Sequence, residues 1–184
     1  MVNFKEMSDG VYTLENLFTQ QECEEWIELS EKLGFEPAPI HGESGPVRRA
    51  DIRNNARVLF DDATKSSEVW HRLTVDFPSV VEGWVPIGLN ERMRFYRYDI
   101  GETFKWHADG IHRRDNGQKS FLTFLIYLND DFAGGETVFR GGLRIEPRVG
   151  MGLLFVHWLK HMGAAVTGGR KYVLRSDVMY QRSP

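Results

Sequence analysis

Residues 121–128 read FLTFLIYL, a run in which Thr123 is the one residue whose side chain is neither apolar nor aromatic. A short apolar run that is rich in aromatic and β-branched residues is typical of a strand covered on both faces. Further strand-like runs occur at 93–100, 152–156 and 171–180, with glycines between them. Short strands separated by frequent turns predict a sandwich, a barrel or a jelly roll.

The first ninety residues carry helical signals instead. Thr19 and Glu22 are spaced as a capping box, and apolar residues then recur every three to four positions until Gly34. A second helix is predicted over residues 66–77, ending before a proline. Helices followed by strands predict an α+β protein that is mainly β, in which N-terminal helices support one face of a sheet core.

The composition is that of a globular protein. The chain has 184 residues, 41% of them hydrophobic and 27% charged, which excludes a disordered, collagen-like or coiled-coil protein. This length predicts one domain over residues 1–184, with a helical part over about 1–90 and a strand-rich part over about 91–184. The net charge of −3 provides no general attraction for a polyanion, so a nucleic-acid partner is not expected unless a local basic patch binds it; the arginines available for such a patch are Arg48, Arg49, Arg53, Arg57, Arg113 and Arg114.

The sequence also bears on where in the cell the protein is located. Cys23 is the single cysteine, which excludes an internal disulfide framework and a cysteine-based zinc site. The helical pattern around it predicts a buried position. Nowhere does an apolar run approach the roughly 18 residues of a membrane span, and the first residues do not read as a signal peptide. We therefore expect a cytoplasmic protein that does not associate with a membrane.

The stretch WHADG at 106–110 contains two candidate metal ligands, His107 and Asp109. Residues two apart in an extended chain project to the same side, so the imidazole and the carboxylate would point to one place. His161 follows 54 residues after His107 and completes a set of two nitrogens and one oxygen if a neighbouring strand returns it there. Such a triad is the usual ligand set of non-haem Fe(II) oxygenases. The His-x-Asp tripeptide alone is a weak signal, because it often arises by chance.

Several motifs surround this tripeptide: RFYRYDIG at 94–101, FAGGETVF at 132–139, PRVGMGLLF at 147–155, and Gly169 and Lys171 after His161. With these motifs the chain resembles the prolyl 4-hydroxylase-like branch of the 2-oxoglutarate- and Fe(II)-dependent dioxygenases over about residues 92–180. The resemblance implies a double-stranded β-helix, a jelly roll of the cupin-like type, with helices packed on its larger sheet. It also implies that His107, Asp109 and His161 are the catalytic iron ligands.

Four residues are implied to bind the co-substrate. Lys171 matches the basic residue that holds the distal carboxylate of 2-oxoglutarate, Tyr98 matches a tyrosine that donates a hydrogen bond to it, and Thr123 lies on a pocket-lining strand. Arg175 shares a face with Lys171 in a strand of period two. It could be the anchor instead, bind the proximal carboxylate, or pair with Asp177. A dicarboxylate in a narrow barrel needs a fixed cation, because an unpaired buried charge is costly.

Other positions are open to more than one interpretation. His157 could replace His161 as a ligand, but the spacing to Lys171 favours His161 and leaves His157 at a strand end or a pocket rim. His112 follows in a polar loop, where a surface role is expected. The arginine-rich segment 48–57 is either a solvated loop or a lid whose arginines and asparagines hold the substrate.

The activity implied by the resemblance is the hydroxylation of an unactivated C–H bond, with 2-oxoglutarate decarboxylated to succinate and CO2. Fe(II), 2-oxoglutarate and O2 would be required, with L-ascorbate as a reductant. The implied substrate is a prolyl or other residue of a peptide or protein, and a free amino acid or small metabolite is the alternative. The acidic charge balance disfavours a nucleobase demethylase. A non-catalytic jelly-roll binding module is disfavoured because the three ligands and Lys171 are all present.

Overall fold

The computed structural model describes residues 2–42, 45–73 and 81–183. Within these ranges the chain is mainly β and contains two helices, α1 (Gln20–Leu33) and α2 (Ala63–Arg72). The predicted fold class, mainly β with N-terminal helices, is therefore confirmed. Among the described residues, no helix combines the length and the hydropathy that crossing a bilayer requires.

The larger sheet has nine strands in the described part of the chain. Its antiparallel order is β1 (Asn3–Ser8), β2 (Val11–Glu15), β14 (Gly152–Val156), β10 (Lys119–Tyr127), β17 (Lys171–Arg182), β8 (Arg92–Tyr98), β6 (Ala56–Asp61) and β3 (Glu36–Pro37), while β7 (Trp84–Leu89) also pairs with β17. The long strand β17 therefore lies at the centre, between β10 and β8.

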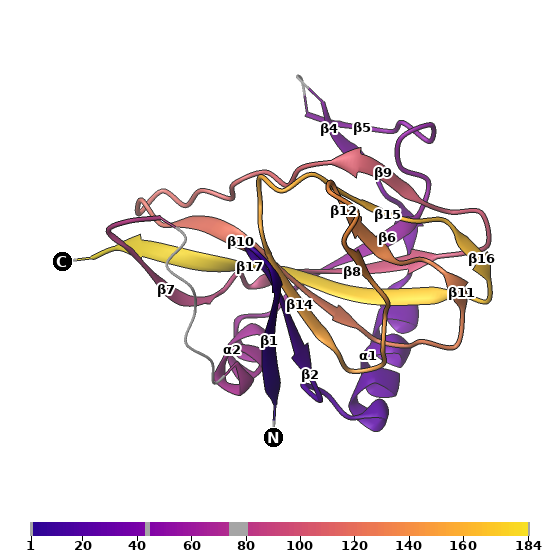
Figure 1. Ribbon diagram of the computed structural model, residues 1–184, viewed down its shortest axis with the longest axis horizontal. Coiled ribbons are helices and arrows are strands. Elements are labelled where there is room, and N and C mark those ends of the chain that lie inside the picture. The colour runs from indigo at the N-terminus through magenta and orange to yellow at the C-terminus, as the bar shows by residue number, and fades with distance from the viewer. Residues whose placement is uncertain (1, 43–44, 74–80, 184) are drawn as a thin grey trace.

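A smaller, four-stranded sheet faces the larger one. Its order is β13 (Arg144–Ile145), β12 (Thr137–Phe139), β15 (His161–Gly163) and β9 (Phe104–His107). Two further pairs are β11 (Ala133–Gly134) with β16 (Val166–Gly168), and β4 (Ile40–Gly42) with β5 (Gly45–Val47). Figure 1 shows both helices on one side of the long strands β17 and β10, and the smaller sheet on the other side.

Alternation of side chains gives the larger sheet two apolar faces. On one face, Phe124 of β10 shares a hydrophobic cluster with Cys23 and Trp26 of α1. On the other face, Tyr127 of β10 shares a second cluster with Phe139 of the smaller sheet. Strand β10 is thus covered on both faces and Cys23 is buried, as the sequence predicts.

Helix α1 begins and ends where its capping signals predict. The Glu22 amide donates to Thr19 Oγ1 and the Thr19 amide donates to the Glu22 carboxylate at 2.9 Å, which completes the capping box. At the other end Gly34 has φ of 84°, a left-handed conformation that glycine adopts without strain.

Helix α2 is displaced from its predicted bounds of 66–77. It begins at Ala63, because the Asp62 carboxylate accepts the Lys65 amide at 2.8 Å and caps the helix there. It ends at Arg72, while residues 74–80 lie outside the described residues.

The first ninety residues also contain strands, where the sequence prediction placed only helices. β1 and β2 extend the larger sheet beyond β14, and β6 pairs with β8 on the other side of β17. These runs are five or six residues long, too short for their hydrophobic pattern to distinguish a strand from a loop. Pairing with partners distant in sequence decides their conformation.

Gly150 joins the start of α1 to the sheet. Its carbonyl accepts the amides of Leu17 and Phe18 at 3.2 and 3.1 Å, and its own amide donates to the Tyr127 carbonyl at 2.9 Å. Its φ is +73°, and a Cβ atom here would lie 2.0 Å from the Phe18 carbonyl oxygen. Neither the backbone conformation nor the space admits a side chain.

We expect Gly150→Ala to lower the free energy of unfolding by at least about 2 kcal/mol, since left-handed strain and a backbone clash add together. Gly34→Ala is the control, because that glycine has a similar φ of +84° and no atom within 4 Å of the added Cβ. It should cost only about 1 kcal/mol. Urea denaturation measures both values. Equal losses in the two variants would show that the clash is relieved at no cost.

Candidate metal centre

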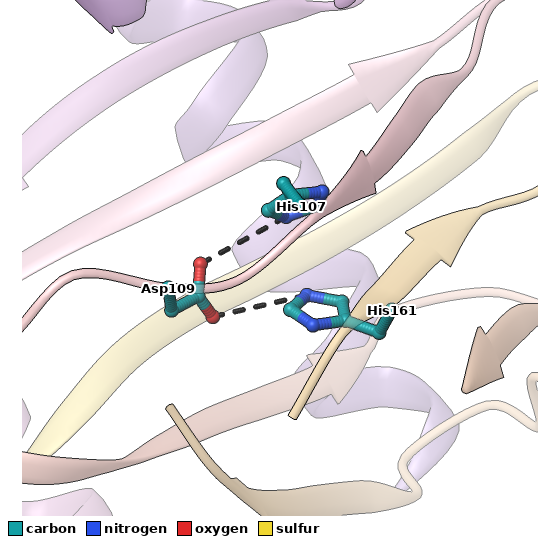
Figure 2. Close-up of side chains that lie close together, drawn as sticks. All are labelled: His107, Asp109 and His161. Carbon is teal, nitrogen blue, oxygen red and sulfur yellow. Dashed lines mark ion pairs between the residues drawn. The ribbon is translucent and has the colours of Figure 1, made fainter. Parts of the chain in front are cut away.

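The three predicted ligands come together between β9 and β15. His107 ends β9, Asp109 follows two residues later, and His161 begins β15. The two strands pair antiparallel with His161 directly opposite His107. Each histidine Nε2 lies 3.8 Å from one oxygen of the Asp109 carboxylate, as Figure 2 shows, and one donor atom from each residue lies within 4.8 Å of the others.

Backbone carbonyls fix the orientation of both imidazoles. His107 Nδ1 lies 2.7 Å from the Lys105 carbonyl and His161 Nδ1 lies 2.9 Å from the Leu159 carbonyl. A carbonyl can only accept, so each Nδ1 carries the proton and each Nε2 presents its lone pair to the common centre. Burial lowers the pKa of His107 to about 4, which keeps this imidazole neutral at physiological pH. Two neutral nitrogens and one carboxylate fit a divalent metal such as Fe(II).

Arg175 keeps the Asp109 carboxylate in its ionised form. Its Nη2 lies 3.2 Å from Asp109 and 3.1 Å from Asp177. Burial would raise the pKa of Asp109, but the Arg175 guanidinium outweighs it and holds that pKa well below its usual value. Of the three roles that the sequence left open for Arg175, the structure displays pairing with Asp177, and it adds a contact with the candidate metal ligand.

A buried chain of hydrogen bonds supports Asp109 from behind. The Thr123 hydroxyl donates to Asp109 Oδ2 at 2.5 Å and lies 2.9 Å from His157 Nδ1. His157 Nε2 in turn lies 2.8 Å from Ser120 Oγ, and the His157 carbonyl accepts the Asp109 amide. The sequence analysis named Thr123 only as a residue of a pocket-lining strand, and it gave no signal for Ser120 or for this network.

Of the two positions predicted for His157, the strand end is confirmed, because the residue directly follows strand β14. A place at the pocket rim is wrong, however, because the residue is 1% exposed and both ring nitrogens contact hydroxyl groups. His112 lies half-buried in the wall of the cavity described next, rather than on the open surface, and is outside the ligand cluster.

A cavity of about 660 Å³ opens onto the triad, and Lys171, Tyr98 and Thr123 lie in its wall. Lys171 is 4% exposed, and its ammonium donates to the Gly135 carbonyl at 2.5 Å. No carboxylate among the described residues forms an ion pair with it. Burial lowers the pKa of Lys171 to about 7. A carboxylate ligand would satisfy this ammonium.

Tyr98 lies directly opposite Lys171 in the pairing of β8 with β17. The Lys171 ammonium lies 5.4 Å from the centre of the Tyr98 ring. Burial raises the pKa of Tyr98 to about 12, so the hydroxyl stays protonated and can donate a hydrogen bond. The predicted co-substrate residues Lys171, Tyr98 and Thr123 therefore share one cavity with the triad.

The segment 48–57 divides into two parts. Residues 48–50 are exposed, as a solvated loop would be. Ile52, Arg53 and Arg57 instead line the cavity. This part of the segment is a wall of the pocket, which the sequence pattern could not distinguish from the exposed part.

Comparison with known proteins agrees with this geometry. Residues 93–176 match the family described as the 2OG-Fe(II) oxygenase superfamily. Together with the relatives and solved structures described next, this match confirms the resemblance to the 2-oxoglutarate- and Fe(II)-dependent oxygenases and to their prolyl 4-hydroxylase-like branch.

Two curated relatives come from Arabidopsis thaliana. Probable prolyl 4-hydroxylase 10 is 25% identical over 191 residues, which cover 85% of this chain and 64% of the relative. Probable prolyl 4-hydroxylase 9 is 30% identical over 117 residues, covering 48% of this chain and 41% of the relative. The chain thus spans less than two thirds of the length of either protein.

Two solved structures share the fold. One is the viral collagen prolyl hydroxylase from Paramecium Bursaria Chlorella virus-1 in its 2OG complex, with a TM-score of 0.63, 19% identity and coverage of 95% of this chain and 99% of that one. The other is a prolyl-4-hydroxylase from Pseudomonas putida, with a TM-score of 0.64, 16% identity and coverage of 95% and 93%.

The bond from Thr123 to Asp109 predicts a role in metal affinity. Thr123→Val removes the hydroxyl that orients the carboxylate, and we expect Fe(II) to bind about 10- to 100-fold more weakly. Thr137→Val is the matched control, because Thr137 lies in the same cavity wall but its hydroxyl contacts Tyr127 Oη at 2.7 Å. Anaerobic equilibrium dialysis measures both affinities. An unchanged affinity in Thr123→Val would show that Arg175 alone orients Asp109.

The environment of Lys171 predicts a pH dependence of 2-oxoglutarate binding. Below its pKa of about 7 the residue is an ammonium, and above it a neutral amine that cannot pair with a carboxylate. Affinity should therefore fall as pH rises above 7, by up to about tenfold per unit. Lys171→Arg keeps its charge and should lose this dependence. Anaerobic titration between about pH 6.5 and about pH 8.5 checks it. The same dependence in Lys171→Arg would assign it to another group.

Proposed function

We propose that this protein is an Fe(II)- and 2-oxoglutarate-dependent dioxygenase that hydroxylates an unactivated C–H bond. The observation that carries the proposal is the position of the triad, His107, Asp109 and His161, in the same cavity as the buried ammonium of Lys171. A metal site and a carboxylate site in one cavity are what this pair of cofactors requires.

Within this proposal, His107, Asp109 and His161 hold Fe(II), which when bound supplies the activation of O2. One oxygen atom enters succinate and the other enters the hydroxylated product, while the C1 carboxylate of 2-oxoglutarate leaves as CO2. Lys171 and Tyr98 hold the distal carboxylate of 2-oxoglutarate. Arg175 keeps Asp109 ionised, and L-ascorbate serves as the reductant that restores Fe(II).

We also infer that the two facing sheets form a double-stranded β-helix of the jelly-roll type. The support is the likeness of the fold to the two prolyl hydroxylase structures.

The names of the relatives favour a prolyl or other residue of a peptide as substrate, and a free amino acid or small metabolite is the alternative. We propose a cytoplasmic location for the protein.

Anaerobic titration with Fe(II) and then with 2-oxoglutarate tests the proposal without a substrate. We expect a visible charge-transfer band that saturates with 2-oxoglutarate and is lost in His161→Ala. His71→Ala is the control, since His71 is exposed on α2, and it should keep the band. A wild-type protein that binds Fe(II) and 2-oxoglutarate without the band, or that binds neither, would overturn the proposal in favour of a non-catalytic module.

A further inference from the structure

We propose that Arg53 and Arg57 form a second anion site in the cavity, which binds a carboxylate of the molecule that is hydroxylated. This inference rests on the proposed function and adds to it the chemical class of the substrate. A site for a carboxylate on the substrate is separate from Lys171, which the co-substrate occupies.

Arg53 is a buried cation with an unused donor. The residue is 6% exposed and lines the cavity, and its Nε donates to Asn55 Oδ1 at 2.7 Å. Its Nη2 atom is buried and has no hydrogen-bond partner among the described residues. Leaving a charged donor buried and unpaired is costly, so the arrangement is poised for an acceptor that enters the cavity.

Two aromatic rings hold the Arg53 guanidinium in place. Its central carbon lies 4.4 Å from the ring centre of Tyr96 and 4.4 Å from that of Phe104. The second ring in turn stacks on the His107 imidazole, with centres 3.5 Å apart and planes 14° from parallel. A single ring therefore separates the guanidinium from a candidate metal ligand. A carboxylate bound there would lie in the same cavity as the triad.

Arg57 brings a second positive charge to the same wall. It lies opposite Tyr96 in the pairing of β6 with β8, and it lines the cavity. No ion pair or side-chain hydrogen bond of Arg57 is found within the part of the chain that the structure describes. Burial lowers the pKa of Arg57, and the nearby charges of Arg53 and Arg94 lower it further, while Tyr96 and the Glu36 carboxylate act in the opposite direction.

The other arginines of the cavity are already neutralised. Arg92 pairs with Asp61, Arg94 pairs with Asp177, and Arg175 pairs with both Asp109 and Asp177. These pairs use both carboxylates in the cavity wall among the described residues, Asp109 and Asp177. Arg53 and Arg57 form no ion pair among the described residues, and the Glu36 carboxylate, whose residue lies opposite Arg57 in the pairing of β3 with β6, offsets their charge only in part. An anionic ligand would balance the remainder.

Tyr96 lies near several arginines of this wall, of which Arg175 lowers its pKa most and Arg53 next. Burial would raise the pKa of Tyr96, yet Arg175 and Arg53 outweigh it and hold the pKa at about 8. A neutral peptide group would leave the field uncompensated, whereas a carboxylate would remove it. The substrate is thus a carboxylic acid, either a free amino acid or similar small acid, or a peptide that presents an acidic side chain or its own C-terminal carboxylate.

Inorganic sulfate is the probe for the anion site. Protein loaded anaerobically with Fe(II) and saturating 2-oxoglutarate has Lys171 occupied, so a further anion must bind elsewhere. We expect sulfate, at constant ionic strength, to raise the Tm of this loaded protein by a few degrees in a saturable way. The Arg57 side chain is partly exposed, so the Arg57→Met variant should fold. We expect this variant to lose the sulfate-dependent increase in Tm.

Arg92→Met is the matched control, because Arg92 lies in the same wall but pairs with Asp61 at 2.7 Å. It should keep the increase. A Tm that does not rise in the wild type, or that rises equally in Arg57→Met, would overturn the anion site. The charge-transfer band recorded on each sample shows whether Fe(II) and 2-oxoglutarate are bound. A failure of the proposed function is therefore distinguished from a failure of the anion site.

Succinate release then distinguishes the two sources of the carboxylate. Free L-amino acids are compared with their carboxamides, and amide-capped peptides containing aspartate with the same peptides containing asparagine. Stimulation by a carboxylate at least tenfold above its amide partner supports the proposal and identifies the source. Equal stimulation by a carboxylate and its amide would overturn it.

Discussion

The pairing of β9 with β15 is the constraint on which the rest of the site depends. It places His161 directly opposite His107, although 54 residues separate them in the chain. Because side chains alternate along a strand, a shift of one residue in this pairing would turn His161 away from the cavity. Each orienting carbonyl lies two residues before its histidine: Lys105 is within β9, and Leu159 is in the bend that leads into β15.

Charge in the cavity is arranged in a graded way. Close to the triad, Arg175 and Asp177 form a buried, mutually compensated group that keeps Asp109 ionised. Lys171, Arg53 and Arg57, in the wall of the same cavity, form no ion pair with a carboxylate in the described part of the chain. Compensated charges stabilise the site, whereas uncompensated ones are available to ligands. The same residue type therefore has two different roles, according to whether the fold supplies its counter-ion.

Sequence alone predicted the parts of the site that depend on local spacing. His107 and Asp109 lie two apart in an extended stretch, and the spacing to Lys171, read through the family resemblance, favoured His161 over His157 as the later candidate ligand. Sequence alone could not predict the role of residues that depend on a partner distant in the chain. The strands β1, β2 and β6 form only by pairing, His157 is bonded only because β14 lies beside β10, and Arg53 is buried only because it meets Phe104. None of these contacts leaves a periodic signal in the chain.

The place of β17 in the sheet has a consequence for biosynthesis. This strand is the last in chain order, yet it lies between β10 and β8 and supplies both Lys171 and Arg175. During synthesis the two halves of the larger sheet have no common neighbour until residues 171–182 leave the ribosome. Asp109 likewise lacks its guanidinium partner until then. The surroundings of the candidate triad are therefore completed only once this strand has paired with both of its neighbours.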